Sequence, residues 1–278
     1  MYSQIRTPAL CVKVLIVMLV ALIASNGAFG ATNLISSSPS IPRERSEKVF
    51  VPIAQLLSKT TGEHFEYRYP VNWPGYIQDM RESTSQLLFD EPHLVGWRLD
   101  TGRHTPLLKL SGAVRFVIIA RTDDKSIIQL SDLAGYTVCA NAPPVLDGLV
   151  LFAQFRNPVR QPQIRQAKDS VAAYGQVLNK RCRAAVLPER VYKKLSHSVN
   201  NTRALFLSET FPSWTLSADF RVPKSLRDQI QRTLLSPDHR RLTDALIEVF
   251  YPGSSLLPTR GSDYRGYGSL LENFWGLR

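Results

Sequence analysis

The feature that most constrains this chain is the alternation of short apolar runs with helix-like segments from residue 33 onwards. Residues 113–121 and 184–187 are compact apolar runs bounded by turn residues, as expected of buried strands. Residues 43–61 instead repeat apolar side chains every three to four positions, which predicts a helix. Alternation of this kind predicts an α/β fold in which mostly parallel sheets are flanked by helices.

The length of the chain, 278 residues, favours two such sheets in two lobes. We expect lobe 1 to comprise residues 31–111 and to be completed by residues 216–278, which end in a tail rich in Gly, Ser and aromatic side chains. Lobe 2 is expected at residues 112–215. Because ligands bind beyond the carboxyl ends of strands in open α/β sheets, two facing lobes predict one cleft between them.

The N-terminus has the three-part pattern of a secretory signal peptide over residues 1–30. Basic residues precede an apolar run at residues 14–24, and the small residues Ala28 and Gly30 follow at the −3 and −1 positions of a cleavage site. Eleven apolar residues are short for a membrane span, which needs about 20. The pattern predicts a mature protein secreted to the periplasm, and an uncleaved N-terminal anchor is the alternative.

Two cysteines, Cys139 and Cys182, follow the signal peptide. In an oxidising compartment this pair suggests a disulfide, and two buried free thiols are the alternative. Neither cysteine lies in a Cys-x-x-Cys or Cys/His pattern, so we expect no metal and no cofactor.

The formal net charge is +11, with 24 Arg against 10 Lys. The planar guanidinium binds carboxylate or phosphate through two parallel hydrogen bonds, so an anionic partner is one interpretation. A merely solvated basic surface is the other. The Arg residues are scattered and form no recognised motif, so we expect no nucleic-acid partner.

The sequence carries no motif of a known catalytic class. It has no His-Glu-x-x-His, no Gly-x-Ser-x-Gly and no phosphate-binding loop, and its five His are far apart. The adjacent carboxylates Asp90 and Glu91 point in different directions, whereas two-carboxylate chemistry needs a pair that faces across a substrate. We therefore expect binding rather than catalysis, and a secreted enzyme assembled from distant residues is an alternative.

Four segments occur in an order that is informative as a set. They are a helix and strand, a strand ending in Asp at a helix start, a Ser-Asp-Leu-Ala-Gly block with the strand after it, and an Ala-Ala-Val-Leu strand, at residues 50–70, 87–99, 120–144 and 178–192. Together they resemble the phosphate/phosphonate-binding group of periplasmic solute-binding proteins that serve ABC transporters, over residues 33–250.

The resemblance implies a two-lobed type II periplasmic binding protein that acts as a monomer. Such a protein captures a small anionic or zwitterionic ligand in the interlobe cleft and delivers it to an ABC permease at the inner membrane. A sensor or accessory protein of the same fold, not coupled to transport, is the alternative function.

The turn at residues 141–148 departs from the pattern of the phosphonate-binding members. Those members have a Ser/Thr-rich turn there, whose hydroxyls and backbone N–H groups hold the oxyanion. Here the turn has no Ser or Thr, and Pro143 and Pro144 remove two N–H donors. Asp147 would repel an anion nearby, so the turn argues against phosphonate as the ligand.

Polar and aromatic side chains that follow the predicted strands are the candidate ligand contacts. Each has an ordinary structural alternative: Ser36 and Ser37 as turn formers, Asp90 as a helix cap before Pro92, and the aromatic residues as core. The predicted ligand-binding residues are Ser36, Ser37, Trp73, Tyr76, Asp90, His93, Asn141, Glu189 and Trp214.

Overall fold

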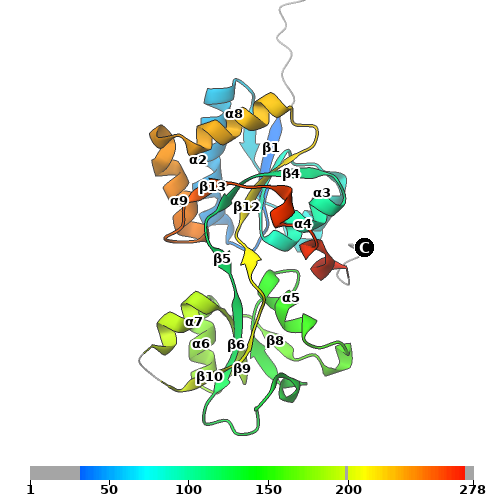
Figure 1. Ribbon diagram of the computed structural model, residues 1–278, viewed down its shortest axis with the longest axis vertical. Coiled ribbons are helices and arrows are strands. Elements are labelled where there is room, and N and C mark those ends of the chain that lie inside the picture. Colours follow the sequence, from blue (N-terminus) through cyan, green and yellow to red (C-terminus); the bar gives the residue numbers. More distant parts are fainter. Residues whose placement is uncertain (1–31, 198–199, 273–278) are drawn as a thin grey trace, which may run out of the picture. The chain divides into compact units, whose positions relative to one another are not determined.

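The structure, a computed structural model, describes residues 32–197 and 200–272. The predicted signal peptide, residues 1–30, lies outside the described residues. Within them, two β-sheets are flanked by helices and joined by a short two-stranded ribbon (Figure 1). None of the described helices is both long enough and apolar enough to span a membrane.

The first sheet has six strands in the order β13-β4-β12-β3-β1-β2. In chain order they are β1 (Asn33–Ser37), β2 (Phe65–Tyr67), β3 (Leu87–Asp90), β4 (His104–Leu110), β12 (Thr215–Asp219) and β13 (Leu256–Pro258). Strand β1 pairs in parallel with β2 and β3, whereas β12 pairs antiparallel with both β3 and β4. The sheet is therefore mixed rather than mostly parallel as predicted, because among the described strands only β1 with β2 and β1 with β3 pair in parallel, and β12 and β13 pair antiparallel with their neighbours.

The first sheet forms its core with helices from both ends of the chain. These helices are α2 (Arg43–Thr61), α3 (Trp73–Glu82), α4 (Pro92–Asp100), α8 (Lys224–Leu235) and α9 (Arg240–Phe250). Helix α2 buries Phe50 and Leu57 against the sheet, as its apolar spacing predicts. It ends at Gly62, whose φ of 77° lies in the left-handed region that favours glycine.

The second sheet has five strands in the order β10-β6-β9-β7-β8. They are β6 (Phe116–Arg121), β7 (Thr137–Cys139), β8 (Gln163–Arg165), β9 (Ala184–Pro188) and β10 (Thr202–Leu207), and the helices are α5 (Leu146–Ala153), α6 (Ser170–Leu178) and α7 (Glu189–Ser196). Strand β7 pairs in parallel with β8 and β9, and β6 pairs antiparallel with β9 and β10. The apolar run at 113–121 supplies β6, which is buried along its whole length.

Two segments cross between the sheets side by side. Strand β5 (Ala113–Val114) leads from β4 to β6, and β11 (Phe211–Pro212) leads from β10 back to β12. The two short strands pair antiparallel with each other (Figure 1). We propose to divide the chain at these crossings, into lobe 1 (residues 33–111 and 216–272) and lobe 2 (residues 112–215).

Two strands of the first sheet that pair antiparallel, β4 and β12, are not predicted from the sequence. Strand β4 contains Pro106, which has no N–H to donate to a ladder. Pro106 lies where the register with β12 shifts, so the irregularity accommodates it. Strand β12 is Thr-Leu-Ser-Ala-Asp, too polar to predict a buried strand, yet all five of its residues are buried.

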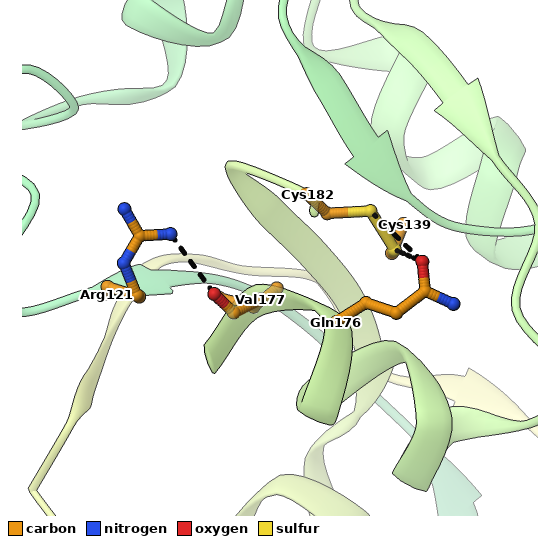
Figure 2. Close-up of a disulfide and its surroundings, with 5 residues drawn as sticks. All are labelled: Arg121, Cys139, Gln176, Val177 and Cys182. Carbon is orange, nitrogen blue, oxygen red and sulfur yellow. Dashed lines mark hydrogen bonds between the residues drawn. A yellow bond between two sulfur atoms is a disulfide. The ribbon is translucent and has the colours of Figure 1, made fainter. Parts of the chain in front are cut away.

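Lobe 2 contains the disulfide between Cys139 and Cys182, which confirms the predicted pairing (Figure 2). The bond joins the end of β7 to the segment between α6 and β9, across a sequence separation of 43. Both cysteines are buried, and the side-chain oxygen of Gln176 lies 3.3 Å from Cys139 Sγ. Nearby, Arg121 Nη1 donates to the carbonyl of Val177 at 3.1 Å, which ties α6 to β6.

We expect reduction of this disulfide to lower the free energy of unfolding by about 2–4 kcal/mol, because the bond restricts the unfolded chain. Urea unfolding with and without a reductant measures the difference. The double variant Cys139→Ala with Cys182→Ala is the control and should not respond to the reductant. An unfolding midpoint that ignores the reductant in the unaltered protein would contradict the expectation.

Candidate ligand-binding site

A cavity of about 430 Å³ lies between the two sheets and is lined from both lobes. Lobe 1 contributes the loop after β1, the start of α4 and the end of α9. Lobe 2 contributes the turn before α5 and the start of α7, and both crossings add residues. The volume is that of a small-molecule site, and the cavity is the place where the two-lobe fold predicts one.

One wall of the cavity is acidic, because Glu91 from lobe 1 and Asp147 from lobe 2 both line it and the charge of one acts on the other. Glu91 is the residue before α4, and Asp147 lies in the first turn of α5. Both are buried, with 7% and 8% of their surface exposed. Burial raises the pKa of Glu91 to about 8, and the charge of Asp147 adds to the effect.

Asp147 holds the turn before α5 in place. Its Oδ2 accepts from the backbone N–H and from the side-chain amide of Asn141, at 3.0 and 3.1 Å. Burial raises the pKa of Asp147 to about 6, against these hydrogen bonds, which lower it. The turn also needs Gly148, because a Cβ there would lie 2.3 Å from the carbonyl oxygen of Asn141.

The start of α7 gives the cavity a basic region. Glu189 pairs with Lys193 at 2.7 Å and lies 3.9 Å from Arg115. Arg190 stacks over the ring of Tyr251, 4.1 Å from its centroid, and Nη1 contacts the carbonyl of Pro252 at 3.4 Å. Among the described residues no carboxylate pairs with Arg190, so its charge is available to a ligand.

A buried ion-pair network lies behind the acidic wall. Arg98 donates to Asp90 at 2.5 Å and to the hydroxyl of Tyr76 at 2.8 Å. Tyr76 in turn donates to Asp90, at 2.5 Å to Oδ1. The backbone N–H of Ser38 also donates to Asp90, at 3.1 Å. Arg98, Tyr76 and Asp90 are almost wholly buried, so the network fixes the ends of β1 and β3 beside the cavity.

The structure brings three of the predicted ligand contacts into the cavity wall: Asn141, Glu189 and Trp214. Asn141 follows β7, Glu189 follows β9, and Trp214 lies on the return crossing, where its ring stacks on Phe89. Their contact with a ligand stays a prediction.

The other six predicted residues lie outside the wall of this cavity. Tyr76 and Asp90 belong to the buried network, and Ser37 pairs with the hydroxyl of Tyr67 at 2.8 Å. Ser36 donates to the carbonyl of Arg68, and Trp73 packs edge-on against Tyr76. His93 Nε2 donates to the carbonyl of Pro144 at 2.8 Å, which links α4 to the turn of lobe 2.

The alternative interpretation of Asp90, as the residue that caps the start of α4, is wrong, because the next residue has that position. The N-cap of α4 is Glu91, followed by Pro92 at the first helical position. Asp90 instead accepts three side-chain hydrogen bonds from Tyr76 and Arg98. The Asp-Glu-Pro pattern indicated a cap at Asp90 because it cannot reveal that Arg98, eight residues later, pairs with this carboxylate in the core.

Sequence reasoning missed the cavity residues Ser40, Arg115 and Arg190 as binding candidates. Arg190 directly follows the predicted Glu189 at a helix start, so the same placement argument would have found it. Arg115 lies between β5 and β6, inside a segment read only as a strand. Ser40 donates to Glu91 at 3.2 Å, a contact that no local pattern indicates.

Comparison with known proteins decides the family. The family model described as "ABC transporter, phosphonate, periplasmic substrate-binding protein" matches residues 35–264. The chain belongs to this family. It is therefore a periplasmic substrate-binding protein of the ABC phosphonate transporter type, and the resemblance of the four segments is confirmed. No curated protein matches the sequence.

Solved structures share the fold at low sequence identity. A Xanthomonas citri protein bound to ATP has a TM-score of 0.66 at 11% identity, over 89% of this chain and 97% of that one. PhnD1 from Prochlorococcus marinus, in complex with methylphosphonate, has a TM-score of 0.64 at 12% identity, over 88% and 98%. A binding protein component of an ABC phosphonate transporter from Pseudomonas aeruginosa gives 0.59 at 13%, over 82% and 81%. The predicted two-lobed type II fold is confirmed.

We expect Arg98→Met to lower the free energy of unfolding by about 3–5 kcal/mol, because it leaves Asp90 as a buried charge without its cation. Urea unfolding measures the loss. The matched control is Arg240→Met, at a side chain that is 81% exposed and should change stability by less than about 0.5 kcal/mol. A loss below about 1 kcal/mol in Arg98→Met would contradict the role given to the network.

The stability of the empty protein should depend on the pH through Glu91. Its pKa is about 8 when folded, above its ordinary value of 4.5, so the folded state holds the proton more tightly. The stabilisation that this proton provides is present below about pH 4.5 and is lost as the pH rises towards 8. Asp147 acts in the same direction between 3.8 and about 6.

Glu91→Gln should therefore become more stable relative to the unaltered protein as the pH rises from 5 to 8.5. We expect a relative gain on the order of 1–3 kcal/mol, measured by urea unfolding at several pH values. The exposed Glu63→Gln is the matched control and should show the pH profile of the unaltered protein. Parallel profiles for Glu91→Gln and the unaltered protein would contradict the burial of an ionisable Glu91.

Proposed function

We propose that this chain captures a small ligand with an acidic group in the cavity between its lobes and presents it to an ABC permease. The observation that supports this most is the guanidinium of Arg190, which has no carboxylate partner among the described residues and lies in the wall of a cavity lined from both lobes. Arg115 and Lys193 also line the cavity, and together they carry one more charge than Glu189, with which both pair. A guanidinium binds phosphonate, phosphate or carboxylate oxygens in a fork geometry, which suits such a group.

The two crossings support capture by closure of the lobes. The strands β5 and β11 connect the lobes as a narrow ribbon, and element-terminal residues of this kind absorb hinge rotations. A ligand that contacts both lobes favours the closed form by its difference in affinity for the two forms. We further propose that the signal peptide is cleaved, that the protein acts as a monomer, and that the cavity binds its ligand without catalysis.

A second candidate function is sensing or presentation of a ligand without transport. The turn before α5 supports it, because Pro143 and Pro144 carry no N–H and Asp147 faces the cavity. A protein for transport and one for sensing would bind the ligand alike. They differ in whether loss of the gene abolishes ligand uptake or only a response to the ligand.

Arg190→Ala should weaken the binding of an acidic ligand about tenfold or more, because one charge-assisted hydrogen-bonding group is lost. Isothermal titration with methylphosphonate, inorganic phosphate and short alkylphosphonates measures the dissociation constants. Arg240→Ala, an exposed change on α9, is the matched control and should bind like the unaltered protein.

Failure of all these compounds to bind the unaltered protein would contradict an acidic-ligand site. Equal binding by Arg190→Ala and the unaltered protein would contradict the role given to Arg190 alone.

A further inference from the structure

One end of lobe 2 lies away from the cavity, at the amino ends of its parallel strands. Strands β7, β8 and β9 begin side by side at this end. The carboxyl ends of β7 and β9 lead instead to the cavity residues Asn141 and Glu189. Three connecting segments close the end away from the cavity, at residues 122–136, 154–162 and 179–183.

Direct contacts hold the three segments together. Arg183 donates to Asp124 at 2.7 Å and stacks over the ring of Tyr136, 4.8 Å from its centroid. Ile127 and Phe155 pack in the same buried apolar cluster. These contacts make one surface, the basic end of lobe 2, from segments that are far apart in the sequence.

The basic end carries more positive charge than its own carboxylates neutralise. Asp123 and Asp124 pair with Arg121 at 3.0 and 3.2 Å, and Asp132 accepts from two backbone N–H groups. The sequence places no other acid in the three segments. Five exposed cations have no carboxylate partner among the described residues: Lys125, Arg156, Arg160, Lys180 and Arg181.

Two aliphatic side chains are also exposed at the basic end. Ile128 is 74% exposed and Val159 is 91% exposed. Ile128 follows Lys125 by three residues, and Val159 lies between Arg156 and Arg160. Single exposed aliphatic residues are common on soluble proteins, but here both lie among cations that have no carboxylate partner in the described part of the chain.

We propose that the basic end of lobe 2 binds the surface of an anionic phospholipid bilayer. The five cations bind lipid phosphates, and Ile128 and Val159 enter the boundary between headgroups and acyl chains. The inner membrane offers such a surface to a periplasmic protein. The inference is independent of the proposed ligand, because the basic end and the cavity lie at opposite ends of β7 and β9.

A bilayer fits the basic end better than other anionic partners do. Its phosphates lie directly above an apolar layer, so one surface accepts both the cations and the aliphatic side chains. Single-stranded nucleic acid needs rings on which bases stack, whereas Tyr136, the aromatic residue exposed here, already stacks with Arg183. An acidic protein would match the cations alone, and the experiment below distinguishes it from a bilayer.

Sedimentation with vesicles measures the binding. The protein is purified as it is secreted, and its mass identifies the N-terminus, because the apolar residues 14–24 would bind any bilayer if they were retained. Phosphatidylcholine vesicles with about 30 mol% phosphatidylglycerol should bind the protein at least tenfold more tightly than pure phosphatidylcholine vesicles, because each cation near an anionic surface adds about fivefold. Salt at about 0.5 M should remove most of this binding, since it screens the charges.

Two double variants test the basic end itself. Arg156→Gln with Arg160→Gln should weaken binding to the anionic vesicles about tenfold or more, because two cations are lost. Ile128→Ser with Val159→Ser should weaken it about threefold or more, because the aliphatic contact is lost while the charge stays the same.

The matched controls make the same changes on lobe 1. Arg45→Gln with Lys59→Gln removes two exposed cations of α2, and Val71→Ser removes an aliphatic side chain that is 94% exposed. Both controls should bind the anionic vesicles like the unaltered protein. All of these positions are exposed, so the urea unfolding midpoint should stay the same in every variant.

Selective binding to the anionic vesicles that is weakened by the basic-end variants and kept by the controls supports the proposal. Failure of the unaltered protein to bind these vesicles overturns it, and the basic end would then face solvent or an acidic protein. Equal binding to both kinds of vesicle also overturns it, because the cations then contribute nothing. Equal losses in the basic-end variants and the controls overturn it too, because binding then follows net charge rather than this surface.

Discussion

The geometry of the cavity depends on the buried ion pair between Asp90 and Arg98, which is completed by the hydroxyl of Tyr76. Asp90 ends β3, and the next residue is Glu91 of the acidic wall. Through the N–H of Ser38, Asp90 also holds the loop after β1, from which Ser40 reaches Glu91. Because the three network side chains are almost wholly buried, loss of one leaves the others unsatisfied, so the network either holds as a unit or fails as one.

The other half of the acidic wall is built by lobe 2 in a different way. Asn141 and Gly148 fold a tight turn around the carboxylate of Asp147, and the carbonyl of Pro144 accepts from His93 of α4. Burial lowers the pKa of His93 to about 3, so its ring is neutral and donates through Nε2. The two lobes therefore face each other through one neutral hydrogen bond from His93 and through a pair of acids, Glu91 and Asp147. The pair is the part of this contact that can respond to charge.

Much of the fold could be predicted from the sequence, because buried strands form compact apolar runs and amphipathic helices repeat apolar side chains every three to four residues. The runs that became β6 and β9 are examples, and so is α2 with its glycine stop. Strands β4 and β12 were not predicted, since a proline interrupts one and polar residues fill the other. Their burial depends on partners far away in sequence.

The candidate site was predictable only where topology alone places a residue at the cavity. Asn141 and Glu189 follow strands whose carboxyl ends face the cavity, and this rule found them. The same rule also selected Asp90 and Tyr76 as ligand contacts, although both lie outside the cavity wall. It cannot reveal that Arg98 of α4 donates hydrogen bonds to both of them. The meeting of Glu91 with Asp147 across the lobes needs the tertiary structure.

A crystal structure of the protein with methylphosphonate would test the central claim most directly. The account predicts the ligand in the cavity between the lobes, with its phosphonate group against the guanidinium of Arg190. A phosphonate group bound at the start of α5, away from Arg190, would contradict it.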